Sequence, residues 1–121
     1  RLVLYKRIAS AKNEDELKDL QIEMIDRFGL LPEQTKNLFA STSLRFICEK
    51  IGIDKIIIFD NKAEITLGAN HAIEAIKIIN LIQQETQTYQ LKGQNTLVFK
   101  AQMEQDSSRI VSVENLLKNL L

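Results

Sequence analysis

The sequence has few of the residues that build catalytic and metal sites. It contains one cysteine, one histidine and no tryptophan. A single cysteine excludes an internal disulfide, and one histidine with one distant cysteine falls short of the ligand set that a zinc site needs. Cys48 lies in a helical apolar pattern, where a small buried hydrophobic side chain is typical. A nucleophile pair of Cys48 and His71 stays open, although no local signature supports it.

Phosphate-binding loops and membrane segments are also missing from the sequence. The four glycines stand singly, at positions 29, 52, 68 and 93, so there is neither a Walker A loop nor a G-x-G-x-x-G motif. No apolar run approaches 18 residues, and no signal-peptide pattern opens the chain. We therefore expect a soluble, cytoplasmic chain without catalytic residues, cofactor, metal or membrane partner.

The charges balance, since sixteen basic residues stand against sixteen acidic ones. A net charge of zero gives no overall attraction to nucleic acid, and without tryptophan a base-stacking platform is not expected. Two small basic patches remain. Lys6, Arg7 and Lys12 mark one near the start of the chain, and Arg45 and Lys50 can form another. Direct DNA contact through the first patch is the minority interpretation.

The apolar periodicity predicts an α+β fold in one domain, residues 1–121. A helical part, residues 1–51, precedes a strand-containing part, residues 52–121, in which two hairpins form a small antiparallel sheet. Because the chain starts at Arg1 within a helical pattern, we expect it to be a fragment of a larger protein. The expected order is ααα-ββ-α-ββ-α: helices over 2–11, 14–28 and 32–51, strands over 53–60 and 63–68, a helix over 70–84, strands over 88–92 and 96–100, and a helix from Asp106 or Ser107.

Local signals mark several helix ends. Asn13 has the position of an N-cap, and Glu16 follows it at capping-box spacing. Gly29 is placed to end the same helix, and Pro32 to open the next one in its first turn. Between them, Leu30 and Leu31 are expected to enter the core. The helix over 70–84 is apolar nearly all round, so we expect it to be well covered.

The helix predicted over 14–28 has two distinct faces. Its apolar face carries the expected core residues Leu17, Leu20, Met24, Ile25 and Phe28. Its other face carries four carboxylates at steps of three, four and three: Glu16, Asp19, Glu23 and Asp26. This spacing keeps the four acidic side chains in about one quadrant of the helix. The acidic stripe is either a solvated surface or a docking surface for a basic partner, for which arginine is the best-suited residue.

The segment RLVLYKRIASAKNEDELKDLQIEMIDRFGLLPEQTKNLF, residues 1–39, resembles the C-terminal domain of bacterial transcription-repair coupling factors, the Mfd family. The resemblance is close over YKRIASA, ELKDLQIEMIDRFG and LLPEQTKNL, and it continues more loosely to the end of the chain. Residues 60–71 and 84–105 follow the family only loosely, so no site is transferred to them.

The resemblance implies a function that periodicity alone does not reveal. The family is a multidomain, ATP-driven DNA translocase that removes stalled RNA polymerase from damaged DNA and recruits the excision-repair protein UvrA. In it, this domain is a non-catalytic regulatory clamp, while ATP and magnesium bind elsewhere in the parent. The clamp docks on a UvrB-like module, masks UvrA binding and restrains ATPase and translocation.

Two hypotheses follow for the residues that contact a partner. In the first, Glu23 and Asp26 lie in the matching motif and form the docking contact, flanked by Glu16 and Asp19. In the second, this is an accessory domain that contacts DNA or RNA polymerase through the basic helix end at Lys6, Arg7 and Lys12.

Overall fold

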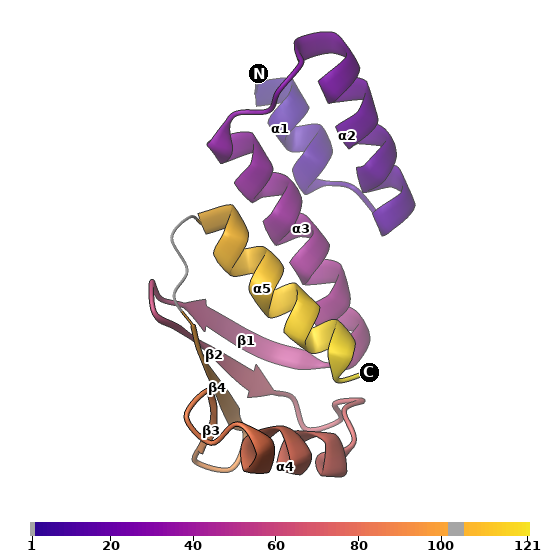
Figure 1. Ribbon diagram of the computed structural model, residues 1–121. Helices are drawn as coiled ribbons and strands as arrows, with labels where there is room; N and C mark the ends of the chain where they lie inside the picture. Colours follow the sequence, from indigo (N-terminus) through magenta and orange to yellow (C-terminus); the bar gives the residue numbers. More distant parts are fainter. Residues whose placement is uncertain (1, 102–105) are drawn as a thin grey trace.

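The computed structural model describes residues 2–101 and 106–121, and the side chains of Asp106 and Ser107 are not described. The described residues form five helices and a four-stranded antiparallel sheet in the order ααα-ββ-α-ββ-α (Figure 1), which confirms the predicted α+β class. The elements are α1 (Leu2–Ala9), α2 (Glu14–Phe28), α3 (Glu33–Ile51), β1 (Ile53–Ile58), β2 (Lys62–Leu67), α4 (Ala75–Gln84), β3 (Tyr89–Lys92), β4 (Thr96–Lys100) and α5 (Asp106–Asn119).

The sheet is built from two hairpins joined in the order β1-β2-β4-β3. In β2, buried and half-buried residues alternate along the whole strand, as expected when one sheet face packs on a core. Its buried side chains, Ala63, Ile65 and Leu67, face the helices. The opposite face therefore carries the other residues of each strand.

Two hydrophobic cores hold the chain together. The larger one lies between the sheet, α3, α4 and α5, and its most completely buried members include Ile51, Ile65, Leu97, Val113 and Leu117. The smaller core is formed by α1, α2 and the first half of α3. Its buried members are Ile8, Ala11, Leu17, Leu20, Met24, Leu31 and Phe39.

Helix α3 joins the two cores. Phe39 packs in the smaller core, whereas Leu44 and Ile47, one to two turns later, pack in the larger one. Figure 1 shows α3 running from the α1–α2 pair down to the sheet, with α5 lying alongside it. The long α3 therefore sets the position of the helical part relative to the sheet.

The predicted start and end of α2 are confirmed, whereas the predicted place of Pro32 in the first turn of α3 is wrong. The Asn13 side chain accepts a hydrogen bond of 2.8 Å from the Glu16 amide, and Gly29 ends α2 with a positive φ of 77°. At the end of α3, Gly52 has a φ of 93°, and a Cβ there would lie 3.1 Å from the His71 backbone. The positive φ strains any other residue at position 52, and the close approach would force the His71 backbone to shift by a few tenths of an ångström. Pro32 is the residue before α3 and does not lie in its first turn.

Three apolar residues expected in the core are exposed. Ile25 and Phe28 on α2 are 46% and 55% exposed, and Leu30 in the following turn is 96% exposed. The prediction was wrong because α2 contacts the rest of the chain along a narrower stripe, formed by Leu17, Leu20 and Met24. Leu31, predicted with Leu30, is buried as expected.

Helix α4 also departs from the sequence expectation. It begins at Ala75, later than Asn70 or His71, and only one side of it is covered. Ile78 is buried in the larger core, whereas Ile76 and Ile79 point away from it and are exposed. The predicted cap at Asp106 or Ser107 depends on side chains outside the described set.

Candidate functional site

Two carboxylates of the acidic stripe on α2 have partners within the described chain, and two do not. Asp19 and Asp26 are exposed, and within the described part of the chain they have no hydrogen-bond or ion-pair partner. They are seven residues apart, or about two helical turns, and so share one side of α2. Two of the four predicted site residues are thus available to a partner.

Glu23 is already paired within the chain. The Arg7 guanidinium on α1 donates hydrogen bonds of 2.8 Å and 3.2 Å to the two carboxylate oxygens of Glu23. This bond lowers the pKa of Glu23 and raises that of Arg7. Both side chains remain close to half exposed, so the pair ties α1 to α2 while staying accessible from solvent.

Glu16 belongs to the local structure of the helix start. Its carboxylate accepts a long hydrogen bond of 3.4 Å from the Lys12 amide, while its own amide donates to Asn13. The arrangement departs from a strict capping box, because the Glu16 carboxylate accepts from the residue before the Asn13 cap and not from Asn13 itself. Glu16 therefore stabilises the start of α2, and it lies at the margin of the exposed acidic surface.

Exposed apolar side chains adjoin the free carboxylates. Ile22 is 52% exposed and lies three residues from Asp19 and four from Asp26, the spacings of neighbours on a helix surface. Ile25 and Phe28 extend this apolar strip toward the end of the helix. We call the surface formed by Asp19, Ile22, Ile25, Asp26 and Phe28 the α2 face. An apolar centre with a charged margin is the usual composition of a protein-docking surface.

Sequence reasoning found the acidic half of the α2 face but missed the apolar half. It assigned Ile25 and Phe28 to the core and did not single out Ile22. A signal was present, because Ile22 lies on the opposite side of the helix from Leu17, Leu20 and Met24. A large apolar residue opposite the core face is expected to be exposed in the isolated chain, as Ile22 is.

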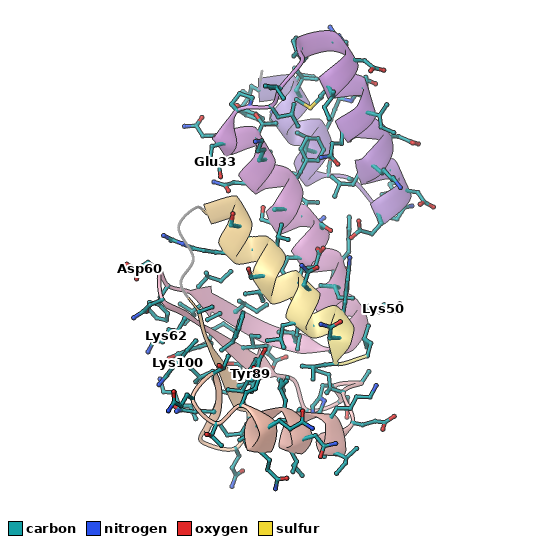
Figure 2. All side chains as sticks on the ribbon, viewed as in Figure 1. Glu33, Lys50, Asp60, Lys62, Tyr89 and Lys100 are labelled. Atoms are coloured by element: carbon teal, nitrogen blue, oxygen red, sulfur yellow. The ribbon has the colours of Figure 1, made fainter. Side chains whose placement is uncertain are left out.

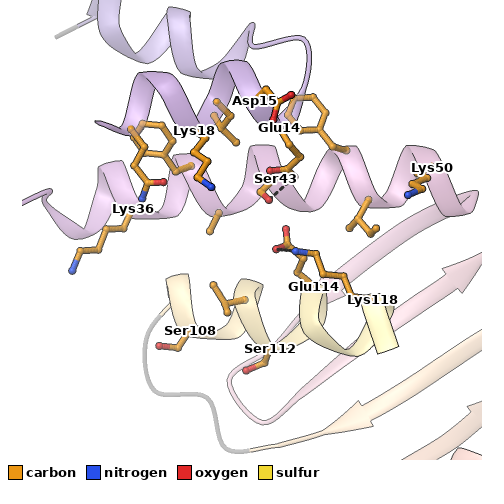
Figure 3. Close-up of a pocket in the computed structure, with 17 residues that line it drawn as sticks. Glu14, Asp15, Lys18, Lys36, Ser43, Lys50, Ser108, Ser112, Glu114 and Lys118 are labelled. Atoms are coloured by element: carbon orange, nitrogen blue, oxygen red, sulfur yellow. Dashed lines mark hydrogen bonds and ion pairs between the residues drawn. The ribbon is translucent and has the colours of Figure 1, made fainter. Parts of the chain in front are cut away.

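A groove of about 1050 Å³ lies between α2, α3 and α5 (Figure 3). Phe39, Phe46 and Val111 supply apolar lining, while lysines and carboxylates line the same groove. Within it, Ser43 donates a hydrogen bond of 2.8 Å to Glu14, which links α3 to the first turn of α2. The groove separates the parts of the molecule that contain the two cores.

The groove holds no arrangement of nucleophile, base and orienting group among its lining residues. Glu114 pairs with Lys118 at 3.2 Å, one turn along α5, and its second oxygen is buried without a partner in the described structure. Nearby, burial raises the pKa of the Cys48 thiol to about 11, and the charges of Glu114 and Glu49 add to the effect. Cys48 is therefore protonated at neutral pH and a poor nucleophile.

His71 has a structural partner in its own loop. Its Nδ1 accepts a hydrogen bond of 3.2 Å from the Ile73 amide, which orders the segment before α4. Across the described residues, no group of three or more histidine, cysteine, aspartate or glutamate side chains is arranged to hold a metal ion. No helix within that same part of the chain is long and apolar enough to cross a membrane.

The two basic patches are partly neutralised. Arg7, the central residue of the first patch, is bound to Glu23, whereas Lys6 and Lys12 have no ion-pair partner among the described residues. In the second patch, Arg45 pairs with Glu49 at 3.7 Å and also donates to the Ala11 carbonyl. Lys50 lies in the lining of the groove, away from Lys6.

The family model of the TRCF domain matches residues 1–78, which include the whole helical part and the first hairpin. The chain belongs to the TRCF domain family. The α2 face lies entirely within the matched segment, so it is part of what the TRCF domain model covers.

Full-length relatives extend the likeness over nearly the entire chain. The transcription-repair-coupling factor of Escherichia coli is 36% identical over 120 residues, and that of Haemophilus influenzae is 37% identical over 120 residues. Each alignment covers 99% of this chain but 10% of the relative. The TRCF domain chain therefore spans about a tenth of the length of the curated relatives it matches.

A solved structure has the same fold. The crystal structure of a C-terminal domain of transcription-repair coupling factor matches with a TM-score of 0.67, at 21% sequence identity, over 98% of this chain and 80% of that one. The fold of the TRCF domain is thus preserved where most residues differ, and the match extends into the strand-containing part beyond residue 78.

Proposed function

We propose that this TRCF domain is a non-catalytic regulatory docking domain, and that the α2 face is its contact surface. The observation that carries the proposal is the exposure of Ile22, Ile25 and Phe28 beside two carboxylates with no partner in the described structure. A soluble helix gains nothing by exposing three large apolar side chains to water, whereas a docking contact would bury them. The free carboxylates of Asp19 and Asp26 would select a basic partner surface.

The partner that fits the family is the UvrB-like module of the same parent protein. In this proposal the α2 face binds basic residues of that module in the resting state, where the domain masks UvrA binding. The same contact restrains the ATPase and the translocation of the parent until RNA polymerase is engaged. Membership of the TRCF domain family supports this assignment, and the α2 face supplies the complementary chemistry.

Glu23 has a different role in this proposal than the sequence indicated. Because Arg7 neutralises it, Glu23 contributes less net charge to the contact than Asp19 or Asp26. An arginine of the partner can still share its half-exposed carboxylate. In this proposal Asp19 and Asp26 therefore select a basic partner surface, whereas Glu23 holds α2 against α1.

The energetics suit a contact that can be released. An exposed ion pair contributes about 0–1 kcal/mol, and burying one large apolar side chain contributes roughly 1.5–3 kcal/mol. Within one protein, a tether supplies an effective concentration on the order of millimolar, so a modest affinity is enough to keep the domain docked. A competing partner can then shift the balance between the docked and released states.

Titration of this chain against the isolated UvrB-like module, at about 50 mM and about 200 mM salt, tests the proposal. We expect binding that weakens as salt rises, because exposed charges contribute to it. The double variant Asp19→Lys/Asp26→Lys should weaken binding at least about tenfold at low salt, since repulsion replaces attraction.

A matched control changes the same net charge far from the α2 face. Glu74→Lys/Glu85→Lys alters two exposed carboxylates at the two ends of α4 and should bind like the original chain. Equal loss of binding in both double variants would show a nonspecific charge effect and would contradict the assignment to α2. Absence of binding at either salt concentration would also count against the proposed partner.

A further inference from the structure

The sheet has one face that no helix covers within the described part of the chain. Helices α3, α4 and α5 all pack in the core on the face formed by Ala63, Ile65 and Leu97. The opposite face is defined by the strand register, which places Lys55 beside Thr66, Glu64 beside Val98, and Lys62 beside Lys100. On the outer strand, Lys92 lies beside Thr96 and belongs to the same face.

Four lysines lie at two opposite ends of this surface, which we call the lysine face. Lys55 and Lys92 occupy one end, on the two outer strands, and Lys62 and Lys100 occupy the other end, on the two inner strands. Figure 2 shows Lys62 and Lys100 projecting from neighbouring strands on the side of the sheet away from α5. A chain with no net charge thus concentrates positive charge on one side of its sheet.

One acidic residue lies within the lysine face. Glu64 contacts Lys62 at 3.5 Å and Lys92 at 3.4 Å. Partial burial by itself would raise the pKa of Glu64, but the hydrogen bond and charge of Lys92 and the charge of Lys62 outweigh it, so the pKa is lowered. Four lysines against one ionised glutamate leave a net excess of three positive charges. Lys55 and Lys100 are exposed and have no ion-pair partner among the described residues.

The composition of the lysine face favours a phosphate backbone over a protein partner. Protein interfaces are enriched in arginine and aromatic residues and depleted of lysine, and this face has lysine without arginine. Thr66 and Thr96, which are within hydrogen-bond distance of each other, add hydroxyl groups of the kind that contact phosphate. Phe59 at the margin is its only exposed aromatic residue among those described, so base stacking on a single strand has no platform.

The spacing of the lysines fits a duplex. Thr66 is four positions after Lys62 along β2, and Lys100 is four positions after Thr96 along β4. At 3.3 Å per residue the two ends of the face therefore lie about 13 Å apart. The major groove of B-DNA is about 12 Å wide, with a phosphate backbone on each side. Lysines at the two ends can therefore reach phosphates of both strands.

We propose that the lysine face binds duplex DNA through its phosphate backbone, without sequence preference. This surface is separate from the α2 face: it belongs to the strand-containing part, whereas the α2 face belongs to the helical part. Docking and DNA contact therefore use different residues, and a chain that fails one test can still pass the other. A few lysine–phosphate contacts give weak binding that depends steeply on salt.

Fluorescence anisotropy of a labelled 20-base-pair duplex tests the proposal with this chain. We expect binding at about 20 mM salt, with a slope of log affinity against log salt of about −3 when three phosphates are neutralised. Lys55→Glu/Lys100→Glu should reduce the affinity at least about tenfold and flatten the slope by roughly two. Both lysines are exposed, and circular dichroism of the variant should be unchanged.

The matched control is Lys18→Glu/Lys36→Glu, which makes the same charge change at exposed positions of α2 and α3. It should retain the affinity and the slope of the original chain. Equal loss in both variants, or no binding at about 20 mM salt, would overturn the proposal. Tighter binding to single-stranded oligo(dT) or to polyglutamate than to the duplex would likewise overturn it, in favour of a single strand or an acidic protein.

Discussion

Reversal of the charge of the two unpaired carboxylates on α2 should expose the UvrA-binding surface in the full-length parent. We expect Asp19→Lys/Asp26→Lys to raise the affinity of the resting parent for UvrA and to raise its basal ATPase rate, while the fold stays intact. Loss of two attractive contacts and gain of two repulsive ones amounts to about 2–3 kcal/mol, which is a shift of roughly 30- to 150-fold between docked and released states. UvrA titration and a steady-state ATPase assay measure the two effects.

The choice of residues keeps this experiment interpretable. Neither aspartate has a partner within the described chain, so their reversal should leave the folding stability nearly unchanged. Glu23→Lys would place a lysine against Arg7 and disturb the contact between α1 and α2 as well. Glu74→Lys/Glu85→Lys in the same parent is the control and should retain low UvrA affinity. A well-folded aspartate variant with unchanged UvrA affinity would refute the autoinhibitory role of α2.

Truncation of Leu117 should destabilise the chain more than any surface change discussed above. Leu117 on α5 is fully buried in the larger core, which joins the sheet to three helices. Removing its side chain beyond Cβ loses transfer free energy and leaves a cavity, so Leu117→Ala should lower the free energy of unfolding by about 2–5 kcal/mol. Since a domain of this size typically has about 5–15 kcal/mol in total, much of its stability would be lost. Urea denaturation followed by circular dichroism measures the change.

Val111→Ala is the matched control on the same helix. Val111 is 46% exposed on α5, and its truncation should cost less than about 1 kcal/mol. Similar losses for Leu117→Ala and Val111→Ala would contradict the placement of the larger core. The same would follow if Leu117→Ala lowered the free energy of unfolding by less than about 1 kcal/mol.

The sequence predicted the element order because its local signals are strong. Asn13 and Gly29 bracket α2, and a change from helical to strand periodicity after Gly52 marks the start of the sheet. The breaks between the predicted strand ranges separate the strands that pair in each hairpin. These features act over a few residues, so they can be recognised without tertiary information.

Burial was harder to predict than secondary structure. Ile25 and Phe28 have apolar side chains at helical spacing from Leu17 and Met24, but whether they are buried depends on how closely α1 and α3 approach α2. The same holds for α4, where Ile76 and Ile79 are exposed because only one side meets the core. The apolar pattern of a sequence identifies the sides of a helix that could be buried, and the fold determines which of them are buried.

The candidate sites show the same limit. The acidic stripe was visible in the sequence as a helical repeat, but the pairing of Glu23 with Arg7 joins residues sixteen positions apart and required the structure. The lysine face was not visible in the sequence, because its four lysines lie one on each of the four strands. Only the strand order β1-β2-β4-β3 brings them to one side.

NMR mapping of the partner contact on this chain would show whether the docking contact lies on the α2 face. The isotope-labelled chain would be titrated with the unlabelled UvrB-like module, and amide shifts would be followed along the sequence. We expect the largest shifts on α2 and the turn after it, residues 19–30, with the sheet unaffected. Shifts confined to the strands or to α4, with residues 19–30 unchanged, would contradict the assignment of docking to the α2 face.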